Sequence, residues 1–216
     1  MPLVLASASP RRQELLRAAG IAFTVKPASV PEERLPAEPP TDYAERLARD
    51  KARAVWKRAQ NHSNLFILGA DTIVLVDNHV LEKPMTEADA VRMLRQLSGK
   101  VHCVITSVCL IGPRGQGKFE DVRSEITRVC FQTISEAEIR EYVATGEPMD
   151  KAGAYAIQGV ASRWIPRIEG CYFNVVGLPI SLVYRMLQEH SAVKNGVKSG
   201  NGSAISTRHR KVSTHN

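Results

Sequence analysis

Ser9, Arg11 and Arg12 occur where a short apolar run gives way to a predicted helix, and their types suit the binding of an anion. The first turn of a helix presents backbone N–H groups without intrahelical partners, at the positive end of the helix dipole. Two guanidinium groups in that turn add forked donors that match phosphate oxygens. The segment SASPRR (residues 7–12) therefore predicts a phosphate site, although a serine-capped helix with two solvated arginines would have the same sequence.

Asp71 follows an apolar run at residues 65–70 that predicts a buried strand. A carboxylate at the end of such a strand is well placed to bind a metal ion or a water molecule. If residues 77–78 form a two-residue hairpin turn, Lys83 lies opposite Thr72 and close to Asp71. The alternative is an ordinary ion pair at the surface, which would contribute little.

Two further polar positions interrupt otherwise structural patterns. Lys51 lies on the apolar face of a helix predicted over residues 41–60, so it either reaches solvent by its flexible stem or serves a site. The segment DKAGAYAIQG (residues 150–159) combines two glycines with Lys151 and Gln158. It suits a loop whose backbone closely approaches a ligand, although it would also suit a turn followed by a short strand.

The elements that must position these residues alternate along the chain. Ser9 and Pro10 mark the start of a helix, and Ser135 with Glu138 forms the capping-box pattern of another. Mixed order of this kind predicts an α/β fold, with a mixed twisted sheet, flanking helices and two lobes around a central cleft. The predicted strands are 3–6, 65–70, 73–76, 79–82, 101–111 and 122–132, with one or two more in 167–176. The predicted helices are 10–19, 41–60, 86–97, 135–145 and 179–188, and a glycine-rich loop is predicted at 112–117.

The net charge of +7 is concentrated at one end of the chain. Residues 191–216 contain five basic and no acidic residues, which leaves a net charge of +2 on the rest. That segment is rich in Ser, Gly and Asn and has few apolar residues, so it predicts a disordered basic tail after a single domain at 1–190. Because the domain is nearly balanced in charge, we expect no nucleic-acid partner.

The cysteines and the chain's first residues bear on the compartment. Cys103, Cys109, Cys130 and Cys171 form no metal-binding spacing and fall in apolar stretches, which is typical of buried thiols in a reducing compartment. We find no signal-peptide pattern and no apolar run long enough to span a membrane. These observations predict a cytoplasmic protein that does not interact with membranes.

Together the quoted segments resemble the Maf family, also called septum formation inhibitor proteins. The resemblance extends from about Leu3 to Leu187. Several separate motifs in one order make it more specific than any single motif. They are SASPRRQELL, RLARDKA, GADTIVLVDNHVLEKP, MLRQLSGKVHCVITSV, ATGEPMDKAGAYAIQG and EGCYFNVVGLP.

The resemblance implies an enzyme that hydrolyses nucleoside triphosphates to the monophosphate and pyrophosphate with a divalent metal, Mg²⁺ or Mn²⁺. It implies that Asp71 is the general base or a carboxylate linked to the metal, and that Glu32 matches an acidic site position. Glu82 stands where the family often has glycine. The residues implied to hold the triphosphate are Arg11, Arg12, Lys51 and Lys83.

The family has branches of different base specificity. The motifs KAG (151–153) and IQG (157–159) resemble the branch that acts on dTTP and UTP, in which Arg11, Thr72 and Gln158 go with specificity. A glutamine amide offers one donor group and one acceptor, which fits the O4/N3–H edge that uracil and thymine share. The alternatives are a 7-methyl-GTP pyrophosphatase of the same family and a non-catalytic regulator of cell division. Dimers are frequent in the family, so a homodimer is possible.

Overall fold

One mixed sheet organises residues 2–59 and 64–195, the part of the chain that the computed structural model describes. Its strand order is β2-β1-β3-β5-β6-β7, and β4 pairs with the end of β3. β1 is parallel to β2 and β3, and the other pairings are antiparallel, so the predicted mixed α/β fold is confirmed. The strands are β1 (Leu3–Leu5), β2 (Thr24–Val25), β3 (Phe66–Val76), β4 (His79–Leu81), β5 (Val101–Arg114), β6 (Gly117–Cys130) and β7 (Arg167–Glu169).

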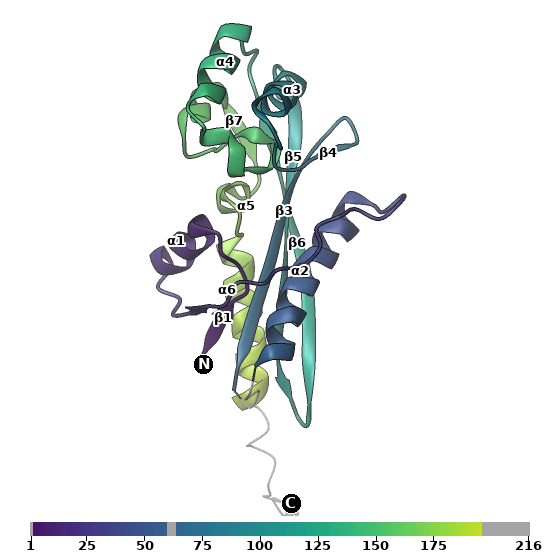
Figure 1. Ribbon diagram of the computed structural model, residues 1–216. Coiled ribbons are helices and arrows are strands. Elements are labelled where there is room, and N and C mark those ends of the chain that lie inside the picture. The colour runs from purple at the N-terminus through teal and green to yellow at the C-terminus, as the bar shows by residue number, and fades with distance from the viewer. Residues whose placement is uncertain (1, 60–63, 196–216) are drawn as a thin grey trace, which may run out of the picture.

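Helices cover both faces of the sheet. Figure 1 shows α2 on one side of the long strands β3, β5 and β6, and α6 on the other, while α3 and α4 lie near one end of these strands. The helices are α1 (Pro10–Ala18), α2 (Pro40–Arg58), α3 (Glu87–Leu97), α4 (Glu136–Ala144), α5 (Tyr172–Val176) and α6 (Ile180–Asn195). Three short 3₁₀ helices, η1 (Glu147–Asp150), η2 (Ala152–Ala154) and η3 (Val160–Trp164), connect α4 to β7.

The two faces of β3 explain this layering. Successive side chains of a strand point to opposite faces, so neighbouring residues enter different cores. Ile67 packs in a cluster with Val55 of α2, whereas Leu68 belongs to the larger cluster that includes Met186 of α6. A strand that is buried on both faces reads as a continuous apolar run, as residues 65–70 do.

Gly69 lets helix α2 approach β3 closely. A Cβ atom at this position would lie 2.2 Å from the backbone oxygen of Ala48, which belongs to α2. Asp71 follows two residues later on the same face of β3, and Lys51 follows Ala48 on the same face of α2. The close approach therefore brings a charged side chain of the helix to a charged side chain of the strand.

The first helix begins where the sequence predicted. Ser9 caps α1, its hydroxyl accepts a hydrogen bond from the N–H of Arg12 at 3.5 Å, and Pro10 occupies the first turn. The hairpin at residues 77–78 is also confirmed, since Val76 pairs with His79 and both turn residues have positive φ. The sheet and this cap fix the strand end and the helix start that border the cleft described below.

Other boundaries differ from the prediction. The predicted loop at 112–117 is wrong, because β5 and β6 continue through it until Arg114 pairs with Gly117. Residues 66–76 form one strand instead of two, and residues 172–176 form helix α5. Helix α6 continues to Asn195, into the segment predicted as a tail, and residues 196–216 lie outside the described part.

We expect Gly69→Ala to lower the free energy of unfolding by about 2 kcal/mol or more, since the added methyl group meets the backbone of α2 and must push the helix from the strand. Urea unfolding followed by circular dichroism measures the change. Gly117→Ala is the matched control, because its Cβ would meet its nearest neighbour, the backbone oxygen of Arg114, at 3.7 Å. Equal stabilities for the two variants would contradict the close-approach argument.

Candidate active site

A cleft of about 640 Å³ separates the first part of the chain, with α1 and β1, from the segment that follows α4. Arg11 spans it, since Nη1 of Arg11 lies 3.1 Å from Oδ2 of Asp150. Every site residue predicted from the sequence lines this cleft, although they come from six separate segments. These residues are Ser9, Arg11, Arg12, Glu32, Lys51, Asp71, Thr72, Lys83 and Gln158.

Lys51 joins the two predicted acidic residues. Its Nζ lies 2.7 Å from Oδ1 of Asp71 and 2.5 Å from Oε1 of Glu32. Lys51 and Asp71 are only 8% and 7% exposed, so this is a buried ion pair, whereas the side chain of Glu32 is 46% exposed. Buried charges need partners, and one ammonium group here serves two carboxylates.

Burial and charge act oppositely on the two carboxyl groups. Burial raises the pKa of Asp71 above its ordinary value, although the charges of Lys51 and Arg12 oppose the shift. Partial burial also raises the pKa of Glu32. The hydrogen bond and the charge of Lys51 outweigh this effect and hold the pKa of Glu32 below its ordinary value. Asp71 is therefore the stronger proton acceptor of the two once both are ionised.

Arg12, in the lining of the cleft, connects three segments of the chain. Its Nε donates to the backbone oxygen of Gly177 at 2.9 Å, and its Nη1 donates to Ser7 Oγ at 3.1 Å and to the backbone oxygen of Ala70 at 3.0 Å. Its Nη2 donates to Oγ1 of Thr72 at 3.1 Å. Four of the five N–H groups of the guanidinium are thus engaged by the protein, which leaves Arg12 one N–H for a ligand.

Thr72 has a place in the same network. Its Oγ1 accepts from Arg12 and lies 2.9 Å from Oγ1 of Thr106, whose hydroxyl donates to the backbone oxygen of Asn174 at 3.0 Å. The side chain of Thr72 is therefore fixed by Arg12 of α1 and Thr106 of β5. By contrast, Lys83 and Gln158 are exposed residues at the edge of the cleft.

Two polar residues of the cleft, Tyr43 and Asp150, have no role assigned from the sequence. The hydroxyl of Tyr43 lies 2.6 Å from the backbone oxygen of Glu32 and 2.6 Å from Oε1 of Glu82, so it ties the Glu32 loop to the end of β4. Asp150 accepts from Arg11 and lies 2.6 Å from Nζ of Lys151. Tyr43 precedes Lys51 by eight residues on one face of α2, a spacing that could have indicated it.

Glu32 and Asp71 are the residues of the cleft that could hold a divalent metal. They share one cation in this structure, the ammonium of Lys51, so their oxygens converge on a single point. Within the described ranges there is no group of three or more His, Cys, Asp or Glu side chains suited to a metal. Magnesium commonly binds through one or two carboxylates together with substrate phosphates, and this pair fits that pattern.

We expect Lys51→Met to lower the free energy of unfolding at pH 7 by about 3 kcal/mol, because Asp71 then lies buried without its ammonium partner. The pKa of folded Asp71 rises further in this variant, so protonation favours the folded state and the deficit shrinks as the pH falls through that pKa. Denaturant unfolding at several pH values measures this. Lys57→Met, at an exposed position of the same helix, is the control, and a deficit independent of pH would contradict the pairing.

A family model described as Maf-like protein matches residues 2–190 of the chain. The chain is 61% identical over 188 residues to a protein of Koribacter versatilis named dTTP/UTP pyrophosphatase, which covers 87% of this chain and 94% of the relative. Relatives of the same name from Syntrophomonas wolfei and Geobacter sp. (strain M21) are 56% and 50% identical over 183 and 193 residues. These matches cover 85% and 89% of this chain, and 94% and 97% of the relatives. With a family match over nearly the whole described chain, the protein belongs to the Maf family.

Proposed function

We propose that this protein is a nucleoside triphosphate pyrophosphatase that hydrolyses dTTP and UTP to the monophosphate and pyrophosphate. The observation that carries the proposal is the buried pair of Asp71 and Lys51 in a cleft lined by cationic side chains. Hydrolysis of a phosphoanhydride needs an activated water and neutralisation of charge on the phosphates, and this cleft offers groups for both. The names of the relatives agree with this chemistry.

Asp71 is the proposed general base. A carboxylate whose pKa is raised by burial accepts a proton more readily than a solvated one, which suits removal of a proton from water. The water oxygen would bond to the α-phosphorus while the bond from that phosphorus to the α,β-bridging oxygen breaks. Pyrophosphate then leaves, and the proton stays on the carboxyl group of Asp71 until solvent removes it.

The cationic residues have graded roles in binding the triphosphate. Arg11 and Lys83 lie at the cleft with charges that a phosphate can reach, Ser9 stands at the start of α1, and Lys51 lies beside the proposed base. Arg12 has one N–H left for a phosphate, so its larger contribution is to hold the walls of the cleft together. Binding to phosphates alone does not distinguish one base from another.

Glu32 and Asp71 are the proposed ligands of a divalent metal, Mg²⁺ or Mn²⁺. Such an ion, when bound, neutralises charge on the triphosphate and polarises its oxygens. With the metal bound, the ammonium group of Lys51 would stabilise the negative charge on the carboxylate and phosphate oxygens next to it. Tyr43 supports this arrangement by fixing the backbone of Glu32.

Gln158 is the proposed determinant of base choice, together with Arg11 and Thr72, which line the same cleft. Its exposed amide borders the cleft, and one amide can both donate to O4 and accept from N3–H of thymine or uracil. Cytosine presents a donor and a bare acceptor instead, so the amide would have to turn over.

A cytoplasmic location, a homodimer and the lack of a nucleic-acid partner remain predictions. In the described part of the chain, no helix has the length and apolar composition needed to cross a bilayer.

Release of pyrophosphate from dTTP, UTP, CTP, GTP and 7-methyl-GTP by the purified protein, with Mg²⁺ or Mn²⁺, tests the proposal. We expect kcat/KM to be highest for dTTP and UTP, with the monophosphate as the second product. A clear preference for 7-methyl-GTP or CTP would overturn the base assignment and the role of Gln158. If the protein releases pyrophosphate from none of these substrates, the proposal that it is a pyrophosphatase is wrong.

Asp71→Asn should lower kcat by about 100-fold or more, because the amide keeps the shape of the side chain but cannot accept the proton. Steady-state assays with dTTP measure the change, and circular dichroism checks the fold. Asp77→Asn is the control, because Asp77 lies in the hairpin turn outside the cleft, where its carboxylate is 2.6 Å from Nζ of exposed Lys100. Near-normal turnover by Asp71→Asn would remove this residue from the mechanism.

A further inference from the structure

The loop that carries Gln158 has little regular structure of its own. It follows η1 and η2 and ends at η3, and Gln158 stands between buried Ile157 and Gly159. A short segment without regular secondary structure can place an exposed side chain such as Gln158 reproducibly only if other groups hold its backbone. Those groups lie outside the cleft, on the side of the loop that faces α4.

The carboxylate of Glu147 packs directly against Gly159. A Cβ at Gly159 would lie 2.0 Å from Oε1 of Glu147, so a larger residue would displace this carboxylate. The backbone of Gly159 is extended, with φ −102°, a conformation open to any residue. Glycine at this position is therefore explained by the space that Glu147 occupies and not by backbone conformation.

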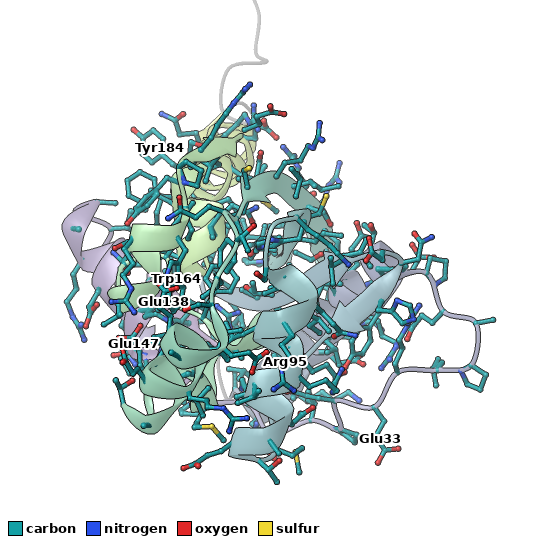
Figure 2. The ribbon with its side chains drawn as sticks, turned by 90° about the horizontal axis from the view of Figure 1, so that it is seen from above. Glu33, Arg95, Glu138, Glu147, Trp164 and Tyr184 are labelled. Atoms are coloured by element: carbon teal, nitrogen blue, oxygen red, sulfur yellow. The ribbon has the colours of Figure 1, made fainter. Side chains whose placement is uncertain are left out.

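One buried hydroxyl holds both Glu147 and the loop. The hydroxyl of Tyr142, on α4, donates to Oε1 of Glu147 at 2.8 Å and accepts from the N–H of Ala156 at 3.2 Å. The ring of Tyr142 is fixed in turn by an edge contact with Trp164, at 5.2 Å between centroids. Figure 2 shows Glu147 in the same region as Trp164 and Glu138, and Nε1 of Trp164 donates to Oε1 of Glu138 at 3.1 Å.

The backbone of Glu147 is held as well. Nζ of Lys151 donates to its carbonyl oxygen at 2.6 Å. The N–H of Val160 also points to Oε2 of Glu147, at 3.5 Å. Contacts on Ala156, Gly159 and Val160 therefore fix the backbone on both sides of Gln158 and leave its amide at the edge of the cleft.

We infer that Glu147 and Tyr142 are positioning residues for base recognition, and that they act by holding the Gln158 loop. Neither side chain lines the cleft, so neither touches the nucleotide. The inference rests on the proposed function, because Gln158 must recognise the base for its position to matter. It predicts that loss of either residue changes the choice among bases while the phosphate chemistry around Asp71 is retained.

The test measures kcat/KM for dTTP and for CTP with Tyr142→Phe and Glu147→Ala. We expect the ratio of the two values to fall by about tenfold, the scale of one lost hydrogen bond, with kcat for dTTP changed by less than about threefold. Glu147→Gln should keep most of the ratio, since its amide oxygen still accepts from Tyr142. Glu141→Ala, at an exposed position of α4, is the matched control.

Combination with Gln158→Ala separates positioning from a general effect on the fold. If Glu147 acts through Gln158, Glu147→Ala lowers the ratio no further in the Gln158→Ala background. An undiminished ratio in folded Glu147→Ala, or full additivity with Gln158→Ala, would overturn the inference. If the unaltered protein hydrolyses dTTP but Gln158→Ala keeps its preference, the base role proposed for Gln158 fails and the inference fails with it, whereas the pyrophosphatase activity stands.

Discussion

The site depends on the ion pairs that the ammonium group of Lys51 makes with the carboxylates of Asp71 and Glu32. A buried carboxylate is costly without a partner, and Asp71 lies at the inner end of the cleft, where little solvent reaches it. The pair forms because Gly69 lets α2 come within backbone contact of β3. A packing constraint in the core thus sets the electrostatics of the cleft, and a shift of α2 that moved Lys51 away would raise the pKa of Asp71 further.

Arg12 provides the second constraint, in a different way. Its guanidinium joins the loop after β1, the strand β3 and the turn after α5, segments that are far apart in the sequence. A planar group with several donors in fixed directions can satisfy two backbone oxygens and two hydroxyl oxygens from three segments at once, which lysine could not do. The residue that looks most like a phosphate ligand in the sequence therefore does much of its work as a brace between the walls of the cleft.

Local signals in the sequence were sufficient for much of this structure. Ser9 with Pro10 located the start of α1, and residues 77–78 located a hairpin, because caps and tight turns depend on only a few neighbouring residues. The loop predicted at 112–117 was wrong because Gly112 lies within a strand. The lack of a side chain there makes room for the ring of Phe119 on the paired strand, which would lie 2.6 Å from a Cβ at Gly112. Tyr43 and Asp150 were missed because Glu82, a partner of Tyr43, and Arg11, a partner of Asp150, are distant from them in sequence and meet them only in the fold.

The site joins two parts that are held by different means. The charged part around Asp71 stands on a strand and a helix in close packing, whereas the Gln158 loop is held by side-chain hydrogen bonds from α4. Asp150 connects the two parts, because it accepts from Arg11 at one side of the cleft and from Lys151 in the loop. A triphosphate that draws Arg11 away would leave Asp150 to Lys151, whose ammonium also holds the carbonyl of Glu147. Under the proposed function, phosphate binding and the placement of the Gln158 loop would therefore be linked through the carboxylate of Asp150, whereas the amide of Gln158 could be exchanged without disturbing the charged groups around Asp71.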